Sequence, residues 1–144
     1  MHHLIQKHGL EAQIQIDSAG TSAGHAGEPA DPRSRATATA RGIELTSISR
    51  QIRGEDLERF DYVIAMDRSN ARNLHKLASN QEQRDRIHLL RSFDPYAGEL
   101  LDVPDPYYND SFDEVFDICE AGCLGLLDHI NQRHKLGLPK LSPE

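Results

Sequence analysis

The sequence is poor in several residue types, and each shortage excludes a class of protein. It has no tryptophan and only two cysteines, Cys119 and Cys123. Two cysteines cannot build the disulfide framework of a small secreted domain, so we expect a reducing compartment and a soluble, cytoplasmic protein. No segment approaches the roughly 18 consecutive apolar residues of a membrane span. Residues 1–5 also lack the order of a signal peptide.

Basic side chains are scarce as well. The 16 Lys and Arg residues face 23 Asp and Glu residues, which gives a formal net charge of −7. This balance argues against nucleic acid and against anionic membranes as partners, because both need a basic surface. A site for phosphate would have to be made locally, by backbone amides and one or two arginines.

The eight histidines are scattered along the chain, and we predict no metal site and no cofactor. Cys119 and Cys123 with His129 and His134 loosely resemble the ligand order of a zinc finger. The five residues between Cys123 and His129 are too few for the turn of such a site, and helical spacing places His129 away from the cysteine face. We therefore predict that both cysteines are buried thiols.

The 144 residues suit one domain, which we predict over residues 1–134 with a flexible tail at 135–144. Polar and apolar residues alternate or run together as in strands near 13–17, 49–52, 62–66 and 87–90. Helical spacing, caps and stop signals predict helices near 32–41, 54–59, 67–77 and 111–134, the last opened by a capping box of Ser111 and Glu114. This alternation predicts an α/β fold with a doubly wound parallel sheet and helices on both faces.

Asp105 stands between Pro104 and Pro106 in the segment after the last predicted strand. The prolines remove two backbone donors, fix two φ angles and push Asp105 out of the helical region. The carboxyl group is therefore presented from a stiff loop, beside Tyr107 and Tyr108. This arrangement suits a general acid, although an ordinary loop aspartate or a helix cap would have the same local pattern.

Four motifs together carry a resemblance to a known family. They are Ile16-Asp17-Ser18-Ala19-Gly20-Thr21, Asp31-Pro32-Arg33, Ala65-Met66-Asp67-Arg68-Ser69-Asn70 and Val103-Pro104-Asp105-Pro106-Tyr107-Tyr108. In order and separation they resemble the low molecular weight protein-tyrosine phosphatases, over about residues 4–130. Four ordered motifs are a far more specific signal than one short pattern.

The resemblance implies phosphoryl transfer through a cysteinyl-phosphate, with Asp105 as the acid that protonates the leaving oxygen and then as the base that activates water. It implies a phosphotyrosine-containing protein or a small aryl phosphate as substrate. Tyr107 and Tyr108 would form an apolar wall for the substrate ring. On the loop after Ser18, Gly24 stands where many members have an aromatic residue, and His25 follows it, so we expect a thinner recognition wall.

The family opens with a strand and a phosphate loop of the form Cys-x5-Arg-Ser, and no residue of this sequence matches that nucleophile. Gly125 and His129 stand six positions after Cys119 and Cys123, where the motif needs arginine. Residues 1–10 resemble the back half of a helix that ends at Gly9. We therefore expect the first strand and the loop to be missing from this chain, and the chain alone to be inactive.

Two other functions are open. A catalytically dead phosphotyrosine-binding or interaction module would keep Asp105 and the surrounding loops without turnover. An arsenate reductase shares this fold and loop, but such relatives use extra cysteines in the segment after the central strand, and residues 67–90 contain none. The sequence predicts no oligomeric state.

Overall fold

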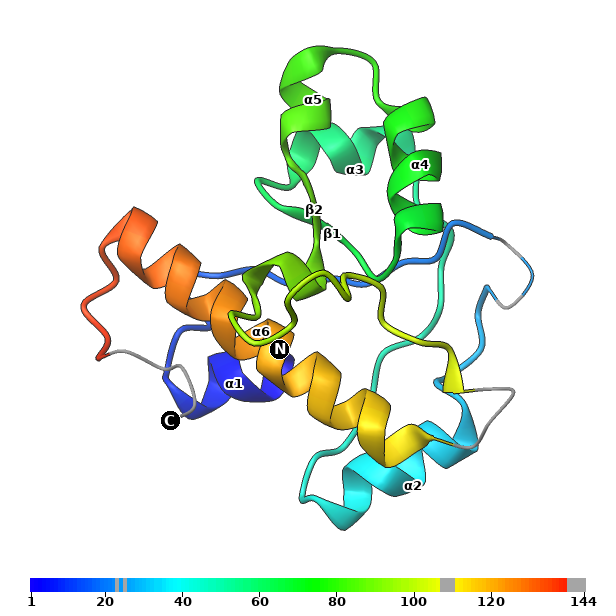
Figure 1. Ribbon diagram of the computed structural model, residues 1–144, viewed down its shortest axis with the longest axis vertical. Coiled ribbons are helices and arrows are strands. Elements are labelled where there is room, and N and C mark those ends of the chain that lie inside the picture. Colours follow the sequence, from blue (N-terminus) through cyan, green and yellow to red (C-terminus); the bar gives the residue numbers. More distant parts are fainter. Residues whose placement is uncertain (23, 25, 107–110, 140–144) are drawn as a thin grey trace. The chain divides into compact units, whose positions relative to one another are not determined.

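The computed structural model describes residues 1–22, 24, 26–106 and 111–139 (Figure 1). The chain divides into two compact units, Met1–Ile52 and Arg53–Glu144. Each unit has its own secondary structure. The prediction of one domain over residues 1–134 stays a prediction.

Two short helices make up the regular structure described in the first unit. Helix α1 (His2–Lys7) buries Ile5, and the chain turns away at Gly9 with φ +65°. Helix α2 (Pro32–Ala40) begins as predicted, because the Asp31 side chain accepts a hydrogen bond from the backbone N–H of Arg33 and proline fills the first position. The helix predicted at 32–41 is therefore confirmed.

The strands predicted near 13–17 and 49–52 are wrong. Residues 14–19 have no regular structure, and Ile16 is 41% exposed. The segment at 48–52 makes only isolated bridges, Gly20 with Gln51 and Pro29 with Ile48. A strand needs a partner along its length, and alternation of residue types cannot supply one. The bridges instead tie the loop at 17–31 to residues 48–52.

The second unit contains a parallel pair of strands, β1 (Val63–Ala65) and β2 (Ile87–Leu89). Val63 pairs with Ile87 and Ala65 with Leu89, and both β1 residues are buried. Helix α4 (Arg68–Leu77) connects β1 toward β2 and contacts both strands. Parallel strands joined through a helix confirm the predicted α/β class.

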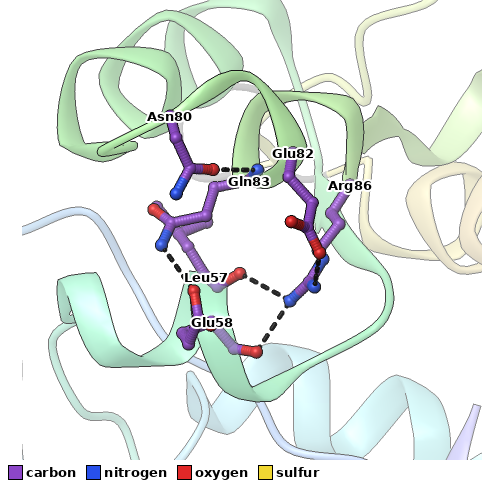
Figure 2. A network of polar contacts seen from close by, with 6 residues as sticks. All are labelled: Leu57, Glu58, Asn80, Glu82, Gln83 and Arg86. Carbon is purple, nitrogen blue, oxygen red and sulfur yellow. Dashed lines mark hydrogen bonds and ion pairs between the residues drawn. The ribbon is translucent and has the colours of Figure 1, made fainter.

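Helix α3 (Gly54–Arg59) has the predicted bounds, whereas α5 (Gln81–Asp85) was not predicted. A polar network joins them, and Figure 2 shows its members pointing toward one another. Arg86 donates to the carbonyl oxygens of Leu57 at 3.1 Å and Glu58 at 2.7 Å, and it pairs with Glu82 at 3.0 Å. The buried Gln83 side chain donates to Glu58 at 2.8 Å. One arginine thus satisfies two carbonyls at the end of α3.

The chain after β2 forms a 3₁₀ helix, η1 (Leu90–Phe93), which packs against the long helix α6 (Phe112–His134). Leu90 and Leu127 are almost completely buried. Ser111 is the N-cap of α6, but its side chain makes no capping hydrogen bond, so the predicted capping box is wrong. No helix in the described part of the chain combines the length and the apolar content needed to cross a membrane.

Helix α6 ends at Lys135, which takes a left-handed conformation with φ +54°. The backbone of Leu138 then folds back to the buried Asn131 side chain, donating at 3.1 Å and accepting at 3.0 Å. The start of the predicted tail is therefore tied to the helix, while residues 140–144 lie outside the described part. Flexibility of the tail stays a prediction.

Candidate functional site

Asp105 lies on the segment 99–106, here called the acid loop, and is exposed to solvent. The backbone N–H of Val103 donates to the carbonyl of Met66 at 2.8 Å. Met66 directly follows the last residue of β1, so this bond fixes the acid loop at the carboxyl end of a parallel strand. Ligands bind at this edge in open α/β sheets. The fold therefore presents Asp105 where a substrate is expected.

Asp102 makes two further anchors of the acid loop. Its Oδ1 accepts a hydrogen bond from the backbone N–H of Arg68, the first residue of α4, at 2.9 Å. Its carbonyl oxygen accepts from a guanidinium nitrogen of Arg91 in η1 at 3.0 Å. Arg91 follows β2 and Arg68 follows β1, so the loop is tied to the ends of both strands.

Charge near these anchors is partly balanced by backbone dipoles. The Asp67 side chain caps α4 by accepting from the Asn70 N–H at 2.7 Å, so two carboxylates, Asp67 and Asp102, meet amides of the first turn. A helix N-terminus stabilises negative charge. Arg91 brings a cation to the same edge, and its Nε is the buried side-chain nitrogen for which the described residues offer no hydrogen-bond partner.

Gly24 belongs to the other predicted part of the site, in the first unit. It is exposed, and its N–H donates to Ser22 Oγ at 3.1 Å. The loop around it is held to Ser49, whose carbonyl accepts from the Gly27 N–H at 2.6 Å and whose N–H donates to the Glu28 carbonyl at 2.7 Å. Gly27 has φ +85°, a conformation that suits glycine. The segment at Gly27 and Glu28, which follows Gly24, is therefore fixed to Ser49.

The start of this loop is also organised by charge. Asp17 pairs with Arg50 at 3.1 Å and accepts from the Ser18 N–H at 2.8 Å. The N–H of Gly20 donates to the Arg50 carbonyl at 2.8 Å. The motif at 16–21 is thus held by the segment at 48–52 of the same unit.

The predicted site residues fall in different parts of the chain. Asp105 lies in the second unit and Gly24 in the first, and each is fixed within its own unit. His25, Tyr107 and Tyr108 lie outside the described residues. The assignment of these residues to catalysis and substrate binding stays a prediction.

The two cysteines lie one turn apart on α6, are free thiols and are half-buried. Burial, followed by the nearby Cys123 thiol, raises the pKa of Cys119 to about 11. A thiol with that pKa is almost entirely protonated at neutral pH and is a poor nucleophile. No three His, Cys, Asp or Glu side chains of the described segments are grouped so that they could hold a metal ion.

Asp102, Arg68 and Arg91 hold the acid loop, and none of the three was predicted from the sequence to do so. Their separations along the chain are 34 residues for Arg68 with Asp102 and 11 for Arg91 with Asp102. No local pattern marks such contacts, since each uses a backbone atom of one partner. The short spacing of Asp102 before Asp105 is the one signal that could have pointed to it.

Comparison with known proteins places this geometry in a family. The family model described as low molecular weight phosphotyrosine protein phosphatase matches residues 1–136. The chain belongs to this family. The resemblance noted from the four motifs is therefore confirmed, and the relatives carry the names of hydrolases that act on phosphotyrosine.

Named relatives of the family cover most of the chain. A low molecular weight protein-tyrosine-phosphatase of Streptomyces coelicolor is 39% identical over 132 residues, which are 90% of this chain and 80% of the relative. The human low molecular weight phosphotyrosine protein phosphatase is 37% identical over 129 residues, covering 87% and 80%. Each relative is therefore matched over well above two thirds of its length.

Solved structures of the family agree with this fold. The crystal structure of YfkJ from Bacillus subtilis has a TM-score of 0.85 and 35% identity, covering 92% of this chain and 82% of that one. A protein tyrosine phosphatase from Entamoeba histolytica, with Hepes in its active site, has a TM-score of 0.83 and 34% identity, covering 93% and 85%. The α/β architecture with parallel strands is the architecture of these phosphatases.

Proposed function

We propose that this chain supplies the general-acid half of a protein-tyrosine phosphatase site, and that Asp105 is the acid. Membership of the family supports the reaction class. The observation that carries the role of Asp105 is its exposed position on a loop anchored to the carboxyl end of β1. A phenol has a pKa near 10 and leaves poorly as an anion, so hydrolysis of phosphotyrosine needs a proton donor.

In the proposed reaction a thiolate attacks phosphorus and forms a cysteinyl-phosphate while Asp105 protonates the departing oxygen. Asp105, now a carboxylate, then takes a proton from the water that attacks phosphorus, which releases phosphate and the free thiolate. The substrate is a phosphotyrosine-containing protein or a small aryl phosphate. Tyr107, Tyr108, Gly24 and His25 are proposed to contact the substrate ring and its surroundings.

The attacking thiolate is proposed to come from a Cys-x5-Arg-Ser loop and first strand outside these 144 residues. The positions six residues after Cys119 and Cys123 hold Gly125 and His129 instead of arginine. The raised pKa of Cys119, about 11, further argues against that thiol as the nucleophile. The chain by itself is therefore proposed to be inactive. A cytoplasmic location also stays a prediction, in keeping with two unpaired cysteines.

Hydrolysis of a series of aryl phosphates tests the proposal. The 144-residue chain and a longer form that carries the Cys-x5-Arg-Ser loop are compared, and kcat/KM is measured against the pKa of the leaving phenol. We expect turnover only in the longer form. Asp105→Asn should then slow phenyl phosphate about 10²-fold or more and affect activated esters far less, because only poor leaving groups need the proton.

Two outcomes would contradict these roles. Equal loss for poor and activated leaving groups would remove Asp105 from the acid role. Vigorous hydrolysis by the 144-residue chain would remove the need for an outside nucleophile. If the 144-residue chain melts cooperatively and binds phosphotyrosine without turnover, the alternative of a phosphotyrosine-binding module is favoured for that form.

A further inference from the structure

We propose that Asp102 is a positioning residue, which sets where the general acid Asp105 stands through the bonds that Asp102 makes to two other elements. The inference rests on the proposed function of Asp105. It concerns a residue that never has to touch the substrate, because it lies three positions before the acid and faces the protein backbone.

The acid loop is held at two consecutive residues, Asp102 and Val103. Asp102 accepts from Arg68 N–H with its side chain and from Arg91 with its carbonyl, at 2.9 and 3.0 Å. Val103 donates to Met66 O at 2.8 Å. The three bonds come from the start of α4, from η1 and from the residue after β1. Bonds in three directions fix both the position and the orientation of this peptide segment.

The backbone between these two residues and Asp105 has little conformational freedom. Only Pro104 separates Val103 from Asp105. Proline fixes its own φ near −65° and confines the residue before it to extended conformations. The path from Val103 to Asp105 therefore has few soft torsions, and a displacement of the anchor is passed on to the acid. A misplacement of about 1 Å is enough to cost a large factor in rate.

The Asp102 side chain should contribute more to the position of the acid loop than to the stability of the fold. Arg68 and Asp102 are both exposed, so water can replace the carboxylate at the Arg68 N–H. Asp67 already caps α4 through the Asn70 N–H. Loss of the Asp102 carboxylate should thus leave α4 folded and the melting temperature nearly unchanged, while the Asp102-Val103 segment loses one of the three bonds named above.

The kinetic test uses the longer form with the nucleophile loop and the aryl phosphate series. Asp102→Ala should lower kcat/KM for phenyl phosphate about tenfold, the change expected when one hydrogen bond to a carboxylate is lost, and should change activated esters less than about twofold. Asp102→Asn keeps an oxygen acceptor and should restore most of the loss. The matched control is Asp94→Ala, because Asp94 Oδ1 also accepts a backbone N–H, that of Tyr96, at 2.9 Å.

The second test needs no activity and uses the 144-residue chain. Hydrogen exchange of the Val103 and Arg68 amides, resolved by NMR, should become about tenfold faster in Asp102→Ala and stay unchanged in Asp94→Ala. Unchanged exchange of the Val103 amide would overturn the proposal whatever the kinetics. So would equal loss of rate for all leaving groups, which is the result of a merely structural role.

The proposed function and this inference fail in different ways. If Asp105→Asn shows no dependence on the leaving group, Asp105 is not the acid and the proposed function fails. The inference as a statement about catalysis then falls with it, and the exchange data alone decide whether Asp102 fixes the loop. If Asp105→Asn behaves as expected and Asp102→Ala does not, only the inference is overturned.

Discussion

Substitution of Gly125 by alanine should destabilise the second unit, since α6 meets η1 backbone to backbone at this residue. A Cβ atom added to Gly125 would overlap the carbonyl oxygen of Phe93 and would lie 2.7 Å from its carbonyl carbon. Nonbonded heavy atoms prefer a separation of about 3.5 Å, so the two elements would have to move apart by more than about 1 Å. Backbone cannot turn aside as the end of a side chain can.

The magnitude follows from two opposing terms. Overpacking of a well-packed contact costs about 1–3 kcal/mol, and the upper end applies because the neighbour is backbone. Alanine in place of glycine inside a helix stabilises the helix by about 1 kcal/mol. The net expectation is a loss of about 2 kcal/mol in the free energy of unfolding. For a chain of this size that corresponds to a melting temperature lower by roughly 8 °C.

The assay is thermal and urea unfolding of the 144-residue chain with two control variants. Gly54→Ala has no atom within 4 Å of the added Cβ and should be neutral or slightly stabilising. Gly122→Ala meets the Leu90 side chain at 2.6 Å and should cost less than Gly125→Ala, because that side chain can change rotamer. A Gly125→Ala protein that melts at or above the unsubstituted chain would refute the reasoning.

Three further outcomes follow from the second unit. Burial, and then the nearby His129, lower the pKa of His88 from its usual 6.5, so the unfolded chain is protonated at His88 before the folded chain and the free energy of unfolding falls as pH drops below about 6.5. His88→Asn should reduce this pH dependence of the free energy of unfolding, measured in urea titrations at pH 5–7. Arg86→Met leaves two α3 carbonyls without the guanidinium nitrogen that binds both, and should cost about 2–3 kcal/mol by urea unfolding. Lysine should not fully rescue it, because its single nitrogen cannot replace both the donor to the carbonyls and the second donor, which binds Glu82. Iodoacetamide should label Cys119 far more slowly than it labels glutathione at pH 7.5, and the labelling rate of Cys119 should rise toward pH 11. Rapid labelling of Cys119 at pH 7.5 would contradict the raised pKa.

The elements with strong local signals were predictable from the sequence. The apolar run around Val63 predicted a central strand, and the Asp31-Pro32 cap predicted the start of α2. Helix α5 was missed because its five residues are too few to show a helical period, and it forms through the Asn80 cap and the Arg86 network. The strand predicted near Asp17 was wrong for the opposite reason. Its polar and apolar residues alternate as in a strand, but in the described part of the chain no neighbouring strand pairs with it.

The candidate site also has one part with a local sequence signal and one part without. The role proposed for Asp105 has signals in the sequence, because two prolines lie beside it and four motifs carry a family resemblance. The anchors at Arg68, Arg91 and Asp102 could not be predicted from the sequence, because they form only where the ends of two strands meet at one sheet edge. The sequence therefore indicates a candidate for the general acid more readily than the residues that hold its loop in place.

The role proposed for Asp105 would connect stability to catalysis within the second unit. Gly125 packs on Phe93, the last residue of η1, and Arg91 of the same 3₁₀ helix holds the Asp102 carbonyl. An η1 displaced by Gly125→Ala should draw Arg91 away from the acid loop. In the longer form, Gly125→Ala should therefore steepen the dependence of kcat/KM on leaving-group pKa at a temperature where the protein is still folded, whereas Gly54→Ala should not. A uniform loss of rate for all leaving groups would mean that η1 contributes to folding alone, and that the acid loop is held by α4 and the end of β1 without it.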